Sequence, residues 1–168
     1  MAQNSWRHGS IAAFLGLFAL GFAPANADVP GRPDPADVAK IDACLADAAR
    51  ATTDLDACIG RISSACAETA TTTAAREECS DRELLVWNGA LTHDYARLTA
   101  MVADATAKQA LRDAQRDFIV SKLKKCTFER LARKDSPEAL VAAARCDVRA
   151  TARQDLWLRE QIESLEPH

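Results

Sequence analysis

Six cysteines are the residues of this 168-residue sequence whose type and spacing most directly predict chemistry. They are Cys44, Cys58, Cys66, Cys79, Cys126 and Cys146. An even number of cysteines in an exported chain predicts disulfides, here three, for which fifteen pairings are formally possible. Zinc is the alternative, but the sequence has no C-x-x-C pair, and His93 and His168 are its only histidines after residue 27. We therefore predict disulfides and no bound metal.

Histidine and carboxylate pairs are the other candidates for chemistry. His93 precedes Asp94, but neighbouring side chains on a helix point in different directions, so we expect an exposed histidine and no catalytic pair. Four acidic residues could suggest glycosidase carboxylates: Glu77, Glu78, Asp81 and Glu83. They fit better at the start of a helix, where the helix dipole favours negative charge. Because the sequence has no phosphate-binding glycine loop and no nucleophile elbow, we predict that the protein is not an enzyme and uses no cofactor.

The first 27 residues are predicted to be a signal peptide. A short basic region at Arg7 and His8 precedes an apolar run, and Ala25-Asn26-Ala27 offers the small residues that signal peptidase requires. The apolar run is shorter than the roughly 20 residues of a membrane span and ends at Pro24, which argues against an uncleaved anchor. We expect a mature chain that begins after Ala27, is periplasmic or secreted, and is not inserted in a membrane.

The charge of the sequence excludes one class of partner. The chain has 21 basic and 24 acidic residues, and the two signs are interspersed along it. Nucleic-acid binding would require a basic surface, so no nucleic-acid partner is expected. The basic run Lys122, Lys124 and Lys125 fits a solvated helix face. The sequence leaves the oligomeric state open.

Apolar residues recur at helical spacing after residue 33, and no segment alternates as a strand does. Residues 28–33 are expected to be a flexible leader. Asp34 is predicted to cap a first helix that has proline at its first position. A second helix then completes a hairpin within residues 34–67. Its apolar face is expected to comprise Leu55, Cys58, Ile59, Ile62 and Cys66.

A third helix is expected to be long and to end near Asp104. Its start stays open, because Thr72 or Thr73 could cap it, while Ser80 with Glu83 also forms a capping box. Its apolar stripe includes Trp87 and Tyr95, which we predict to be core residues.

Two further helices complete the expected fold. A capping box of Thr106 with Gln109 predicts the start of the fourth helix, which should run to about Arg133. The fifth is expected to have Ser136 as its cap and Pro137 at its first position. Residues 74–163 thus form a three-helix part. The prediction is one all-α domain over residues 28–168, a small disulfide-stapled bundle of about five helices in antiparallel hairpins.

The expected turns narrow the disulfide pairing, because residues equidistant from the turn of a helical hairpin face each other. The midpoints between successive cysteines fall at Ala51, between Thr72 and Thr73, and at Ser136. Eight residues along one helix span about 12 Å, too far for a Cys58–Cys66 bridge, whose Cα atoms must lie within roughly 7 Å. The predicted pairs are Cys44 with Cys58, Cys66 with Cys79 and Cys126 with Cys146.

The segment LRDAQRDFIVSKLKKC, residues 111–126, resembles the signature helix of the lysozyme-inhibitor LprI-like family. That signature reads L-x-x-A-Q-R-x-W and is followed by an aromatic residue, an arginine and a cysteine. The resemblance extends from about Cys66 to Arg159 and leaves the hairpin of residues 34–67 as an addition. Matching positions elsewhere are Cys66, Cys79, Leu91, Tyr95, Cys146 and the run from Thr151 to Arg153.

Four positions depart from the family pattern. Phe118 replaces the signature tryptophan, Ser121 the following aromatic residue, Lys122 the arginine and Asn88 an upstream aspartate. The ammonium group of lysine is a point charge, whereas the guanidinium of arginine is planar and can form two parallel hydrogen bonds. These replacements therefore affect a polar binding site more than they affect the packing of the hydrophobic core. Phe118 is expected to remain a core residue.

The resemblance implies an exported, non-enzymatic protein that binds lysozyme and inhibits it by blocking its active-site cleft. The alternative is a structural or stress-related periplasmic module that does not bind lysozyme. Two roles stay open for Gln115, Tyr95 and Asn88. They could form a buried hydrogen-bond network that fixes helix packing, since buried polar groups need partners, or they could recognise a ligand.

Peptide mapping under non-reducing conditions tests the pairing. We expect three linked peptide pairs, which join Cys44 to Cys58, Cys66 to Cys79 and Cys126 to Cys146. A peptide that links Cys44 to Cys79 would contradict the prediction.

Overall fold

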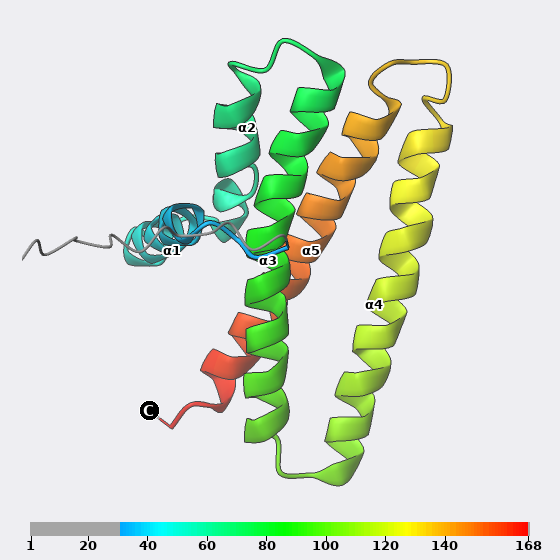
Figure 1. Ribbon diagram of the computed structural model, residues 1–168. Coiled ribbons are helices and arrows are strands. Elements are labelled where there is room, and N and C mark those ends of the chain that lie inside the picture. Colours follow the sequence, from blue (N-terminus) through cyan, green and yellow to red (C-terminus); the bar gives the residue numbers. More distant parts are fainter. Residues whose placement is uncertain (1–30, 168) are drawn as a thin grey trace, which may run out of the picture.

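The computed structural model describes residues 31–167, whose regular secondary structure is entirely helical (Figure 1). The predicted signal peptide and residues 28–30 lie outside the described residues. The elements are α1 (Pro35–Arg50), the 3-10 helix η1 (Leu55–Cys58), α2 (Arg61–Ala67), α3 (Thr73–Met101), α4 (Ala105–Leu131) and α5 (Ala139–Leu165). The predicted all-α class is therefore confirmed for this part of the chain.

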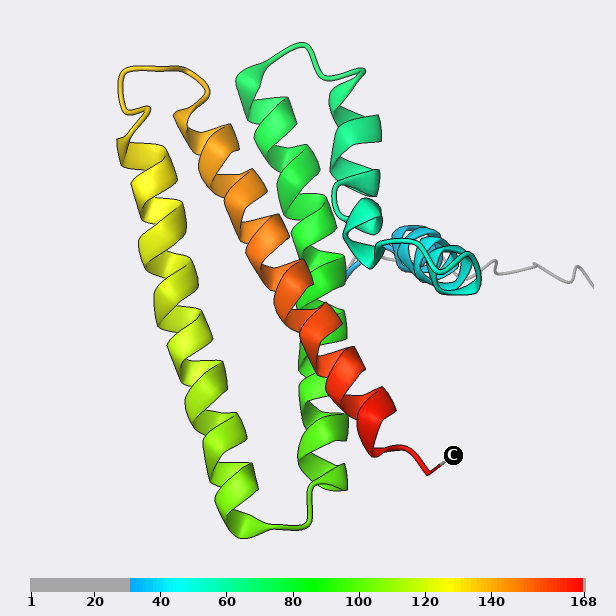
Figure 2. The same cartoon turned by 180° about the vertical axis from the view of Figure 1, so that it is seen from behind.

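The three long helices form the body of the molecule. α4 returns antiparallel to α3, and α5 then runs antiparallel to α4 and crosses α3 (Figures 1 and 2). α5 packs on both α3 and α4, whereas α2 packs on α3. α1 is seen end-on in both views, so it lies across the long helices on the side away from α4. Only two residues of α4 are buried, Leu111 and Cys126, compared with ten in α5.

Local capping explains where α1 and α3 begin. The Asp34 carboxylate accepts a hydrogen bond from the Ala36 amide at 2.8 Å, and proline occupies the first position of α1 as predicted. The Thr72 hydroxyl accepts from the Ala75 amide at 3.1 Å, so α3 starts at the earlier of the two expected positions. Ser80 and Glu83 consequently lie inside α3.

Several expected helix boundaries were wrong. The second helix is interrupted, because Gly60 adopts φ +94°, a left-handed conformation that glycine tolerates, and divides η1 from α2. α3 ends at Met101, before Asp104, because Asp104 caps α4 by accepting from the Ala107 amide at 2.8 Å. An aspartate at this position displaces the expected Thr106 cap.

The end of α4 and the start of α5 also differ from the prediction. α4 ends at Leu131, slightly before Arg133, and α5 begins at Ala139, two residues after Pro137. Ser136 does accept a hydrogen bond from a backbone amide, that of Glu138 at 3.1 Å, but it does so in the turn before the helix.

The core has two connected parts. One lies where α1, η1 and α2 pack on α3 and α5, and it includes Ile41, Ile62 and the fully buried Trp87. The other lies among α3, α4 and α5 around Leu98, Leu111 and Leu158, with Tyr95 and Phe118 half-buried at its edge. Burying such side chains stabilises the fold by about 1.5–3 kcal/mol each.

Three disulfides join neighbouring helical segments. Cys44 of α1 is bridged to Cys58 of η1, Cys66 of α2 to Cys79 of α3, and Cys126 of α4 to Cys146 of α5, with Cα atoms 5.8, 5.6 and 5.4 Å apart. These are the sequential pairs that hairpin geometry predicts. Each bridge closes one turn of the chain and, by the chain-entropy model, contributes about 3 kcal/mol.

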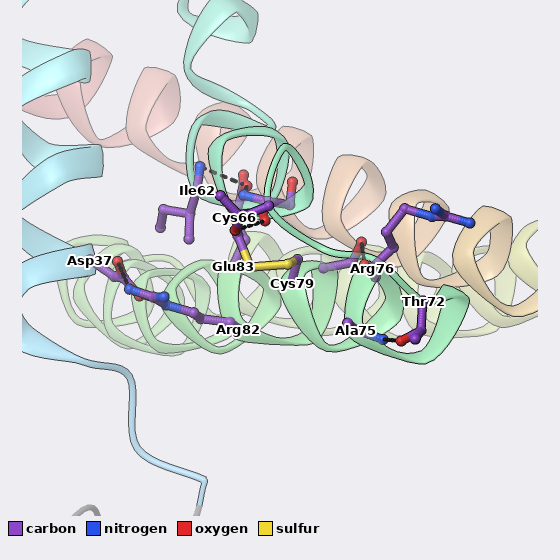
Figure 3. Close-up of a disulfide and its surroundings, with 12 residues drawn as sticks. Asp37, Ile62, Cys66, Thr72, Ala75, Arg76, Cys79, Arg82 and Glu83 are labelled. Atoms are coloured by element: carbon purple, nitrogen blue, oxygen red, sulfur yellow. Dashed lines mark hydrogen bonds and ion pairs between the residues drawn. A yellow bond between two sulfur atoms is a disulfide. The ribbon is translucent and has the colours of Figure 1, made fainter.

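A contact between the exposed Arg82 and a buried carboxylate holds α1 against α3. Asp37 is 1% exposed, and Arg82 of α3 binds both of its oxygens, with Nη2 2.7 Å from Oδ1 (Figure 3). Hydrogen bonding to Asp37 raises the pKa of Arg82 above its ordinary value. The planar guanidinium suits this two-point contact, which fixes the angle between the helices.

Glu83 of α3 accepts more side-chain hydrogen bonds than any other residue in the described part of the chain, and the prediction that it is a first-turn charge was wrong. It is fully buried, and its carboxylate accepts from the amides of Gly60 at 2.6 Å, Ile62 at 3.1 Å and Ser63 at 2.8 Å. The indole Nε1 of Trp87 donates to it at 3.0 Å. Figure 3 shows Glu83 beside Ile62 and the Cys66–Cys79 bridge.

Glu83 supplies from α3 the cap that α2 lacks. Gly60 precedes α2 and has no side chain to accept from the first-turn amides. A carboxylate at this end is favoured both by the free amides and by the helix dipole. Burying a charge is costly unless it is hydrogen-bonded, and here four donors satisfy it.

We therefore predict that Glu83→Gln destabilises the protein by about 2–4 kcal/mol, because the amide group turns a donor toward buried donors. The free energy of unfolding from urea titration measures this. Glu78→Gln is the matched control, since Glu78 is exposed on the same helix, and it should stay within about 0.5 kcal/mol of wild type. Equal stability of the two variants would contradict the capping role.

Candidate functional site

The signature residues of α4 lie along a groove between α4 and α5, which we call the α4–α5 groove. Its volume is about 560 Å³, and Phe118 and Lys122 both line it. Its charged lining residues are Asp117, Lys122, Lys125, Arg149 and Arg153. With four basic residues and one acidic residue, the groove has the electrostatic character of a site for anionic groups.

Lys122 is held in the groove by three neighbours. Its Nζ lies 5.9 Å from the centre of the Phe118 ring, 3.3 Å from the hydroxyl of Thr151, to which it donates, and 3.6 Å from a carboxylate oxygen of Asp147. A cation above an aromatic face is attracted by the ring quadrupole. Lysine at this signature position therefore joins α4 to α5 by contacts that do not require the planar fork of an arginine.

Gln115 joins the same two helices. Its Oε1 accepts a hydrogen bond from Nε2 of Gln154 in α5 at 3.2 Å. Asn88 is exposed on α3, and Tyr95 is half-buried. The suggested network of Gln115 with Tyr95 and Asn88 is therefore not formed, because Gln115 bonds to α5 and the Asn88 side chain lies in solvent.

Two groove cations differ from the others in having no fixed partner. Arg153 is bound to Asp56 of η1 at 2.8 Å, and Lys122 is held as described. For Lys125 and Arg149, no carboxylate lies within ion-pair distance in the described part of the chain. These two side chains are the ones free to bind an external anion.

A second polar group, which the sequence analysis missed, lies between α3 and α5. Asp155 is fully buried, and Arg159 donates to its Oδ2 at 2.8 Å. The same Nε of Arg159 lies 3.1 Å from Asp94 of α3. Burial raises the pKa of Asp155 to about 6, Arg159 partly offsets this effect, and Asp94 adds to it. This group is a packing contact between two helices, in which burial favours the protonated form of Asp155.

His93 contacts the same group from the solvent side. Its side chain is 76% exposed, as expected, but its Nδ1 lies 2.8 Å from Oδ1 of the buried Asp94. The expectation that the two neighbouring side chains point apart was therefore wrong. A signal for this group exists in the sequence, because Asp94 and Asp155 interrupt the apolar stripes of their helices. A charge in such a stripe indicates a buried ion pair.

Within residues 31–167, no three His, Cys, Asp or Glu side chains are grouped as metal ligands. In the same range, no helix combines the length and the hydropathy that a membrane-spanning helix needs.

The protein-family model described as lysozyme inhibitor LprI matches residues 63–158 of this chain. The chain belongs to this family. The match begins in α2, ends in α5 and includes all of α3 and α4, so the predicted family resemblance is confirmed. Two of the three disulfides lie inside the matched range, whereas the Cys44–Cys58 bridge lies before it. The comparisons found no matching curated protein and no matching solved structure.

The raised pKa of Asp155 predicts a pH dependence of stability. The folded protein favours the protonated form, since the pKa of about 6 exceeds the ordinary 3.8. Protonated Asp155 therefore contributes its full stabilisation of the folded state below pH 4, and this contribution is lost as the pH rises to about 6. By linkage, its size is on the order of 3 kcal/mol.

Urea titrations from pH 3.5 to 7 test this prediction. The difference in unfolding free energy between wild type and Asp155→Asn should change across this range, because the variant lacks the titrating group. Asp117→Asn, an exposed carboxylate of α4, is the matched control and should run parallel to wild type. Parallel curves for Asp155→Asn would show that Asp155 does not titrate as described.

Proposed function

We propose that this protein is an exported lysozyme inhibitor that binds lysozyme at its active-site cleft and catalyses no reaction itself. The observation that carries the proposal is the family match, which spans α3, α4 and most of α5 together with two bridges. Export is supported by the three disulfides, which fit an oxidising compartment, and by the predicted signal peptide. A periplasmic or secreted location follows from the same arguments.

The α4–α5 groove supports a specific contact. Lysozyme cleaves its substrate with two carboxyl groups that flank the scissile bond in its cleft. Lys125 and Arg149 are cations at the groove without a fixed carboxylate partner among the described residues. We infer that they face the catalytic carboxyl groups, where pairs of opposite charge orient the two proteins and speed their association. The overall charge of −3 would also attract a lysozyme of basic charge, chiefly by faster association.

Inhibition of lysis is the direct test. The exported, oxidised protein should slow the lysis of a peptidoglycan suspension at a concentration near that of the enzyme. Several classes of lysozyme should be compared, because the chain does not indicate which one is bound. Complete lysis by every class at a large molar excess of the protein would overturn the proposal and would favour the structural envelope module.

Charge reversal tests the contact separately from the function. The double variant Lys125→Glu, Arg149→Glu should need at least about tenfold more protein for the same inhibition. Arg145→Glu is the matched control, because Arg145 is exposed on α5 one turn away and lies outside the groove. If the double variant inhibits as well as wild type, lysozyme inhibition stands but the groove is not its contact surface.

A further inference from the structure

Several large apolar side chains of α4 are exposed on the side that faces away from α5. Five residues there are 50% to 68% exposed, although each is a large apolar side chain. We call them the outer face of α4: Ile119, Val120, Leu123, Phe128 and Leu131. Leu111, Phe118, Lys122 and Cys126, by contrast, are the residues that face α5 or the core. Single exposed apolar residues are common, but five within thirteen positions of one helix are a patch that a partner can cover.

The charge on α4 is predominantly positive. α4 contains seven basic and three acidic residues, a net charge of +4, whereas the whole chain carries −3. Two of its acidic residues are already paired, Asp113 with Arg116 and Glu129 with Arg133. In the described part of the chain, Arg112, Lys124 and Arg130 have no carboxylate within ion-pair distance. Asp117 is the acidic residue of α4 that likewise has no ion-pair partner among the described residues, so the unpaired charge on this helix is predominantly cationic.

We propose that the outer face of α4 docks the protein on an anionic lipid surface, with the helix lying in the plane of the headgroups. A helix that presents aliphatic and aromatic side chains among lysines and arginines has the composition of an interfacial helix. The stretch from Val120 to Leu131 is about 17 Å long at 1.5 Å per residue. The apolar side chains would enter the acyl boundary, while Lys124, Arg130 and Arg112 remain beside the phosphates.

Charge and shape favour this occupant over two others. A second copy of the chain would bring one cationic α4 against another, and these charges would repel. A protein partner would need a groove that matches the convex side of a single helix, whereas a fluid lipid surface adapts to that shape. The groove residues Lys125 and Arg149 lie on a different side of α4 and α5, so lipid binding is separate from the proposed lysozyme contact.

Vesicle flotation tests the proposal. The exported protein is used after mass measurement of its N-terminus, because an uncleaved apolar leader would itself bind lipid. We expect it to float with vesicles of phosphatidylglycerol and phosphatidylcholine, and to bind them at least about tenfold more tightly than phosphatidylcholine alone at low salt. Binding should weaken as salt is added, because the headgroup attraction is screened.

Variants locate the contact. Leu123→Gln with Phe128→Gln should weaken binding at least about tenfold by removing buried apolar area, and Lys124→Glu with Arg130→Glu should do the same for anionic vesicles. Leu165→Gln and Arg61→Glu are the matched controls, since both residues are exposed on other helices, and they should bind as wild type.

Three results would overturn the proposal. The first is no flotation of wild type with anionic vesicles, and the second is equal flotation of all variants. The third is a concentration-dependent dimer in light scattering that Leu123→Gln abolishes, which would assign the outer face to a second copy. Lysozyme inhibition should be unchanged in the Leu123→Gln, Phe128→Gln variant, so failure of lipid binding and failure of the proposed inhibition are separately visible.

Discussion

The buried carboxylate of Glu83 is the interaction on which the arrangement of the N-terminal half depends. It satisfies three amides around the start of α2 and the indole of the core residue Trp87. α2 has only seven residues, too few to be stable alone, so it must be held by a partner. Glu83 and the Cys66–Cys79 bridge hold it at opposite ends against α3. With α2 fixed, η1 and the Cys44–Cys58 bridge place α1, whose Asp37 then reaches Arg82.

The three long helices are held with unequal strength. α3 and α5 share a continuous core and the contact of Asp94 with Arg159 and Asp155. α4 is attached by fewer anchors: Leu111, the edge contact of Phe118, the Gln115–Gln154 bond, the contacts of Lys122 and the Cys126–Cys146 bridge. Since only two residues of α4 are buried, most of its surface is available for binding. The signature segment therefore joins α4 to the body and leaves both the groove and the outer face open.

Local signals predicted most of the fold. The cap of α1 by Asp34 with Pro35 and the apolar periodicity depend on residues within one or two turns, so the sequence shows them directly. The sequence offered both Thr72 and Ser80 as caps of α3, and the structure decides for Thr72. The midpoints between successive cysteines predicted the pairs seen in the structure, because each disulfide closes a single turn of the chain. Glu83 was missed because its amide donors lie 20 to 23 residues away, and a capping pattern considers only three or four. The sequence did hold one indication, since Gly60 interrupts an apolar pattern that would otherwise continue as a helix.

The candidate site was predictable in position but not in its contacts. Gln115, Phe118 and Lys122 do lie together on the side of α4 that faces α5, as their spacing requires. Their partners Gln154, Thr151 and Asp147 belong to α5, and the angle at which α5 crosses decides which of them is reached. Asn88, grouped with these residues by sequence pattern, lies exposed on α3. Phe118 and Lys122 can replace the tryptophan and arginine of the signature without loss of helix packing. The Lys122 ammonium lies over the Phe118 ring and donates a hydrogen bond to Thr151, and these two contacts join α4 to α5. Lys125 and Arg149 border the same groove without joining the two helices, and neither occupies one of the fixed positions of the signature pattern.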